Sequence, residues 1–130
     1  MTTIAKALDE LNVTNWIGRG NDPTNELEFY NWFEKTLDDG TVTKDPTYHN
    51  VTWRWVSQKQ QELIDAEPMR LLRAERDRLI AETDWWALSD LTITQAQIDY
   101  RQALRDITKT QTPAVDANGN LTGVTWPTKP

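Results

Sequence analysis

The most regular hydrophobic pattern in the chain lies between residues 68 and 108, where apolar side chains recur with helical spacing in two successive segments. Pro68 suits the first position of a helix, because it lacks an N–H and its φ angle is already helical. Strong helix formers follow it, and Leu72, Leu79 and Thr83 fall on one face. The second segment carries an amphipathic stripe made of Ala96, Tyr100, Ala103, Leu104 and Ile107. We predict helices at about residues 68–83 and 93–107 that form a hairpin.

The connection between these helices contains Trp85 and Trp86. Two adjacent tryptophans cannot share one helix face, so we expect at least one of them to wedge between the helices. Two alternative capping boxes are available at the start of the second helix: Thr92 with Gln95, or Thr94 with Gln97.

Arg101 and Arg105 stand one turn apart beside the apolar stripe of the second helix. Like charges at this spacing repel each other mildly. We therefore expect a nearby carboxylate, Asp84 or Asp90, to face them.

Shorter elements precede the hairpin. Ile4, Leu8 and Leu11 predict two turns of amphipathic helix. Residues 12–20 predict a short strand or extended segment that ends at Gly18 and Gly20. Asp22 is the predicted N-cap of a helix over residues 23–38. Its apolar face would contain Phe29, Trp32, Phe33, Thr36 and Leu37.

Residues 41–56 are harder to interpret. Residues 41–43 favour a short β segment, and residues 44–50 form a loop that is the expected hinge after the N-terminal part. Residues 51–56 alternate like a strand, yet Trp53, Val56 and Leu63 follow helical spacing. We favour a helix at about residues 52–66, either separate from the helix at Pro68 or continuous with it through a kink.

After the second helix the chain becomes polar. Asn118-Gly119 between Val115 and Leu121 is a strong signal for a β-hairpin, and the prolines around Trp126 favour an extended tail. We predict a mainly α fold in three parts: an N-terminal subdomain over residues 1–50, a helical domain over residues 51–108, and a β-hairpin or extended tail over residues 109–130.

Composition narrows the function. The 130 residues carry a net charge of −6, so nucleic-acid binding through a large basic surface is not expected. There is no cysteine, which excludes a disulfide-stapled scaffold. No apolar run approaches the length of a membrane span, and the first residues lack the apolar region of a signal peptide. Seven tryptophans suit a protein interface as well as a core.

No pattern of catalytic or metal-binding residues emerges. His49 is the only histidine and is interpreted as a surface loop residue, without the carboxylate and nucleophile that a catalytic base requires. The run from Asp116 to Asn120 matches half of a calcium loop but lacks its final glutamate, and a hairpin turn explains it better. We expect no enzyme activity, no cofactor and no metal.

Four stretches together resemble a known family. They are Arg73–Trp85, Ser89-Asp90, Tyr100–Asp106 and Trp126–Pro130. Their order and spacing resemble the tail assembly chaperone-like domain of bacteriophages over roughly residues 68–130, and the whole layout is similar to small tail-fibre-associated proteins of marine phages. The sequence departs from the family pattern at Ser89, where a proline is usual; this loosens the turn.

The resemblance implies a non-enzymatic tail protein that binds tail-fibre or other tail proteins, with residues 51–108 as the chaperone-like domain. The expected locations are the host cytoplasm during assembly and the tail of the virion. A homo-oligomer is possible under this hypothesis. Candidate partner-binding residues are Trp85, Trp86, Arg101, Arg105, Trp126 and Pro127. The alternative is a carbohydrate-binding module for host recognition, in which exposed tryptophans would stack on sugars.

Overall fold

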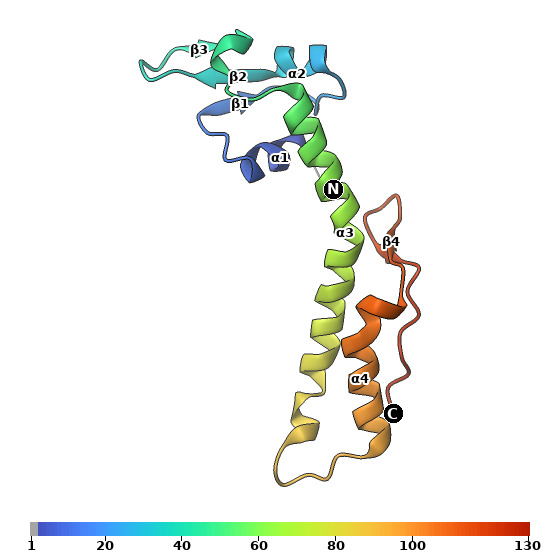
Figure 1. Cartoon of the computed structure of the whole chain (residues 1–130). Coiled ribbons are helices and arrows are strands. Elements are labelled where there is room, and N and C mark those ends of the chain that lie inside the picture. The colour runs from blue at the N-terminus through green and yellow to red at the C-terminus, as the bar shows by residue number, and fades with distance from the viewer. Residues whose placement is uncertain (1–2) are drawn as a thin grey trace. The chain divides into compact units, whose positions relative to one another are not determined.

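The computed structural model describes residues 3–130, and the chain divides into two compact units, Met1–Asp65 and Ala66–Pro130. About 52% of the chain is helical, which agrees with the prediction of a mainly α fold. The helix α3 (Trp53–Glu82) contributes its first residues to one unit and the rest to the other (Figure 1). Within the described residues, no helix has both the length and the apolarity that a membrane crossing requires. The three-part division at residues 50 and 108 stays a prediction.

The N-terminal unit contains short helices and a three-stranded antiparallel sheet with β2 in the centre (Figure 1). Its elements before α3 are α1 (Ile4–Glu10), β1 (Trp16–Gly18), α2 (Glu26–Trp32), β2 (Phe33–Thr36), β3 (Val42–Thr43) and the 3-10 turn η1 (Pro46–Tyr48). In the register of the sheet, Phe33 pairs with Gly18 and Thr36 pairs with Val42. The predicted first helix and the short strand after it are confirmed.

The predicted helix over residues 23–38 is wrong at both ends. Asp22 does not cap it, because its carboxylate accepts the N–H of Ile4 at 2.9 Å. Asn25 caps α2 instead, and its side-chain oxygen accepts the N–H of Glu28 at 2.9 Å. At Phe33 the backbone becomes extended and joins the sheet. The strands on both sides of β2 supply partners for its backbone groups, and this pairing overrides the helical period of the aromatic residues.

The hydrophobic core of the N-terminal unit is largely aromatic. Its buried members are Ile4, Ala7, Leu8, Phe29, Trp32, Phe33, Val51 and Val56. The Trp32 ring lies 5.5 Å from that of Trp16 and covers Gly18, where an added Cβ would overlap the indole. A glycine is therefore required at the end of β1 because of this close approach, while its φ angle is ordinary.

His49 is fully buried, so its interpretation as a surface residue is wrong. Its ring meets Phe33 edge-on at 4.5 Å and lies 5.7 Å from the Tyr30 ring. Neither ring nitrogen has a hydrogen-bond partner among the described residues. Burial, aided by the positive charge of Lys35 and opposed by Asp45, lowers the pKa of His49 from its ordinary value.

The helix α3 begins at Trp53, as expected of a helix at about residues 52–66, and it continues without a break through Pro68. The predicted helix start at Pro68 is therefore wrong, and the continuous alternative is correct. The proline removes one backbone hydrogen bond, to the carbonyl of Ile64. A two-bond ion pair between Glu67 and Arg70, with distances of 2.7 and 2.6 Å, spans the proline on the helix surface.

In the C-terminal unit, α3 is followed by the short 3-10 helix η2 (Asp84–Ala87) and by α4 (Gln95–Thr110). Of the two predicted alternatives, Thr94 and Gln97 form the capping box: each side chain accepts the backbone N–H of the other residue, at 3.2 and 2.9 Å. The predicted stripe of α4 is buried at Tyr100, Leu104 and Ile107 and exposed at both of its alanines.

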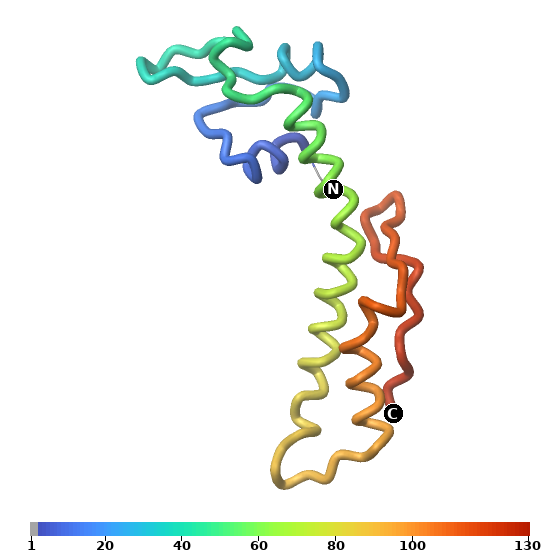
Figure 2. The backbone as a smooth tube through the Cα atoms, viewed as in Figure 1, coloured from blue at the N-terminus to red at the C-terminus, as the bar shows by residue number. Residues whose placement is uncertain are grey.

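The predicted β-hairpin is also present, as β4 (Ala114–Val115) paired with β5 (Leu121–Thr122). Gly119 has a φ of 81° in the turn, a conformation that favours glycine. Beyond β5 the chain runs back beside α4 (Figure 2). There Trp126 packs on a cluster formed by Trp86, Tyr100 and Leu104.

Candidate partner-binding surface of the C-terminal unit

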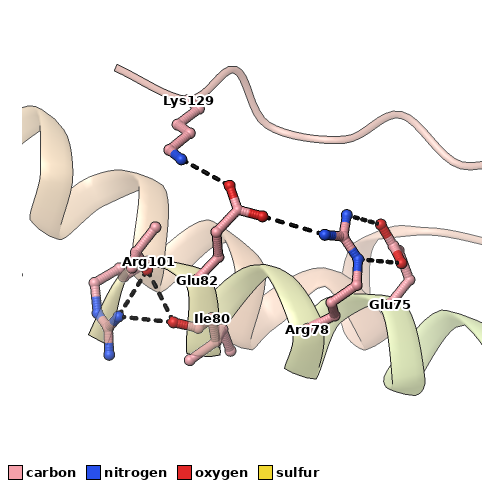
Figure 3. A network of polar contacts seen from close by, with 7 residues as sticks. Glu75, Arg78, Ile80, Glu82, Arg101 and Lys129 are labelled. Atoms are coloured by element: carbon pink, nitrogen blue, oxygen red, sulfur yellow. Dashed lines mark hydrogen bonds and ion pairs between the residues drawn. The ribbon is translucent and has the colours of Figure 1, made fainter. Parts of the chain in front are cut away.

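Arg101 of α4 fastens the end of α3 (Figure 3). Its guanidinium donates to the carbonyl of Ile80 at 3.1 Å, to the hydroxyl of Thr83 at 2.7 Å and to the carboxylate of Asp84 at 3.0 Å. The carbonyl of Ile80 belongs to the last turn of α3 and also accepts the N–H and the hydroxyl of Thr83, each at 3.0 Å. The side chain of Arg101 is only 11% exposed, and these three acceptors all belong to the same unit. Asp84 is one of the two carboxylates expected beside the arginines.

A chain of ion pairs runs over the surface from α3 to the C-terminal tail (Figure 3). Arg78 donates to Glu75 at 2.6 Å and to Glu82 at 3.2 Å, and Lys129 donates to the other oxygen of Glu82 at 2.7 Å. The bond from Lys129 is the main cause that lowers the pKa of Glu82. These groups are solvated, and surface pairs of this kind contribute little to stability because water screens them. They orient the tail more than they stabilise it.

The tail is also held by its aromatic residue and by a side-chain amide. Trp126 packs on the cluster around Tyr100 and Leu104, and the N–H of Thr125 donates to Gln111 at 2.9 Å. Lys129 lies 5.9 Å from the centre of the Trp86 ring. A shallow depression of about 490 Å³ remains open between α3 and this segment, lined by Leu71, Ala74, Glu75, Arg78, Leu121 and Trp126.

The two neighbouring tryptophans have different environments. Trp86 is 4% exposed and packs against Tyr100 at 5.9 Å, so its indole belongs to the core of the unit. Trp85 is 56% exposed and meets Trp86 edge-on at 6.2 Å. Of this pair, only Trp85 offers a large apolar surface to a partner.

The other four candidates also differ in exposure. The guanidinium of Arg101 is bonded to the end of α3 and is largely buried, while Arg105 on the same helix is exposed. Trp126 and Pro127 are half-buried. The structure brings Trp86, Arg101 and Trp126 together around the junction of α3 and α4, and it leaves Trp85 and Arg105 at the surface.

Sequence reasoning missed several exposed apolar residues that follow Trp85 in the connection and the start of α4. Leu88 is 54% exposed, Leu91 is 44% exposed and Ile98 is 42% exposed. The available signal was the presence of leucines in a connection that is otherwise polar. The contact between Glu82 and Lys129 was also missed, and no local pattern signals a pair so far apart in sequence.

Several ionisable groups of this unit form ion pairs, including Glu75, Arg78, Glu82 and Lys129. Among residues 3–130, no three histidine, cysteine, aspartate or glutamate side chains are grouped so that they would hold a metal ion. What the described surface offers a ligand is apolar area and charge.

The comparisons with known proteins concern the same part of the chain. Residues 69–130 match the family model of the phage tail assembly chaperone protein. No curated protein and no solved structure matches the chain. The matched segment contains the end of α3, the connection, α4, the β-hairpin and the tail. Residues 69–130 are therefore a phage tail assembly chaperone-like domain, which points to a role for this protein in phage tail assembly.

Proposed function

We propose that this protein is a non-enzymatic phage tail protein that binds tail-fibre or other tail proteins during assembly. The predicted helical hairpin, made of α3 beyond Pro68 and α4, is the partner-binding element in this proposal. Trp85, Arg105 and the Trp126-Pro127 tail supply its contacts. The observation that carries the proposal is the family match over residues 69–130.

The surface chemistry of the C-terminal unit supports this proposal. Tryptophan and arginine are enriched among the residues that dominate binding energy at protein interfaces. Trp85 is 56% exposed and Arg105 is exposed, so both side chains are available without unfolding the unit. The indole of Trp85 contacts the buried ring of Trp86, with the ring centres 6.2 Å apart.

Co-purification tests the proposal directly. The full chain would be expressed with the tail proteins encoded alongside it, and capture of at least one of them at defined stoichiometry is expected. The same experiment with residues 109–130 deleted reports whether the tail contributes. Circular dichroism would verify that the shortened chain keeps its helices. Failure of the full chain to capture any tail protein would contradict the proposal.

We further propose that the protein acts as an assembly chaperone in the host cytoplasm. A chaperone leaves its client, whereas a structural component stays with it. Mass spectrometry of purified phage particles is expected to find the chain absent or far below the stoichiometry of the tail proteins. Stoichiometric presence in the particle would instead make it a virion component.

The exposed indole of Trp85 is the feature that favours the alternative of a carbohydrate-binding module. Titration with host surface glycans, followed by tryptophan fluorescence, distinguishes the two functions. A saturable response that Trp85→Ser removes would support glycan binding, and no response to any glycan would reject it.

A further inference from the structure

A set of exposed apolar side chains lies along the connection from α3 to α4 and into the first turn of α4. Trp85, Leu88, Leu91 and Ile98 are 56%, 54%, 44% and 42% exposed. The connection that carries the first three is ordered by two successive backbone turns. In these, the N–H of Leu88 donates to the carbonyl of Trp85 at 3.2 Å and the N–H of Leu91 to that of Leu88 at 3.0 Å. Single exposed leucines are ordinary, but a run of large apolar residues on an ordered connection is typical of a binding surface.

The charged residues of this stretch of sequence are all acidic. Between Arg78 and Arg101 the chain has no lysine or arginine, and its charged residues are Glu82, Asp84, Asp90 and Asp99. The first two face cations of the same unit. Asp90 and Asp99 are both exposed, and neither forms an ion pair with a lysine or arginine of the described residues. Asp99 accepts the neutral amide of Gln95 at 2.8 Å.

We propose that Trp85, Leu88, Leu91 and Ile98, with Asp90 and Asp99 at the rim, form a docking surface for a tail-protein segment that combines apolar side chains with lysine or arginine. This inference rests on the proposed function and names the chemistry of its partner. Apolar anchors supply affinity at the centre of such an interface, and complementary charge at the rim selects the partner. A second copy of this chain fits less well, because it would bring the same carboxylates and a net charge of −6.

Overlapping peptides that cover the tail proteins encoded alongside this chain are the probe. Binding of the full-length protein to each peptide would be measured by fluorescence anisotropy at low and at high salt. The expected ligands contain aromatic or aliphatic residues next to lysine or arginine. Their affinity is expected to fall as the salt concentration rises, because exposed charges are screened.

Matched variants locate the binding surface. Trp85→Ser is expected to weaken binding at least about tenfold, as for a central aromatic contact. Trp55→Ser is the control, since Trp55 is 57% exposed but belongs to the N-terminal unit, and it is expected to leave affinity unchanged. Leu88→Ser provides a second test that does not disturb the contact between Trp85 and Trp86.

A pair of charge variants tests the acidic rim. Asp90→Lys is expected to weaken binding about threefold and to reduce its salt dependence, whereas Asp38→Lys, with the same change in net charge, leaves both unchanged.

Failure of this inference is distinguishable from failure of the proposed function. If co-purification succeeds but Trp85→Ser and Leu88→Ser bind like Trp55→Ser, the protein binds tail partners through another surface. Selection of acidic peptides would also overturn the inference. So would a dimer of the full chain, seen by sedimentation, that Trp85→Ser dissociates. If no tail protein is captured at all, the proposed function itself fails.

Discussion

The imidazole of His49 is fully buried beside Phe33 and Tyr30, and within residues 3–130 neither of its nitrogens has a hydrogen-bond partner. A buried ring in this environment resists protonation because the cation would lose its water. Lys35 adds to this effect, and Asp45 opposes it. One side chain therefore links the stability of the N-terminal unit to pH.

We predict that the free energy of unfolding decreases as the pH falls below about 6.5, the ordinary pKa of histidine. The pKa of His49 is lowered in the folded state, so below that pH the unfolded chain binds the proton more readily and is favoured. His49→Leu should remove this contribution, and its advantage over the wild type should be larger at pH 5 than at pH 7. Urea unfolding at both values measures the difference. An equal difference at both pH values would contradict the assignment.

At the scale of elements, the ends of α4 and α3 depend on side chains rather than on intrinsic helix preference. The capping box of Thr94 and Gln97 satisfies backbone groups at the start of α4. Arg101 serves the last turn of α3 from the neighbouring helix, across 21 positions of sequence. The first of these devices is local and could be predicted; the second joins two elements.

We predict that Thr94→Ala lowers the free energy of unfolding by about 1 kcal/mol, because it removes the hydroxyl that caps α4. Thr92→Ala is the matched control, since Thr92 is the alternative cap residue and the structure places it before the helix. It should change stability by less than about 0.5 kcal/mol. Urea unfolding of both variants at one pH is the measurement. Equal losses would mean that the cap does not stabilise the helix.

At the scale of the whole molecule, the described chain has two hydrophobic clusters, one in each compact unit. Phe29 and Leu104 are fully buried, the first in the N-terminal cluster and the second in the C-terminal one. The tail of the C-terminal unit closes its cluster through Trp126. Each unit thus has its own source of hydrophobic stabilisation.

We predict that loss of one cluster weakens its own unit first. Leu104→Ala should cost about 2–5 kcal/mol within the C-terminal unit, and Phe29→Ala about 3–5 kcal/mol within the N-terminal unit. Hydrogen exchange followed by mass spectrometry would measure amide protection in α2 and in α4 for each variant. Loss of protection in both helices to the same extent, in both variants, would show that the units unfold together.

The sequence predicted the elements that rest on local rules. Examples are α1, the capping motif of α4 and the turn at Asn118-Gly119, where residue spacing or a short motif predicts the backbone conformation. The sequence could not show which of the candidate binding residues Trp85 and Trp86 is exposed, because the two are adjacent and identical in type. Their exposure differs only because Tyr100 and its neighbours cover one of them.

By itself, the sequence determined the helix-rich class and the family of residues 69–130, and it limited the start of α4 to two alternatives, since these depend on composition, motif order and side chains within a few positions. Only the tertiary structure decided that residues 33–36 form a central strand and that His49 is buried. It also decided that α3 continues through Pro68 and that Lys129 reaches Glu82. The physical reason is that strand pairing, burial and tail docking depend on neighbours that are distant in sequence. The energy of those contacts exceeds the local preference that a single segment displays.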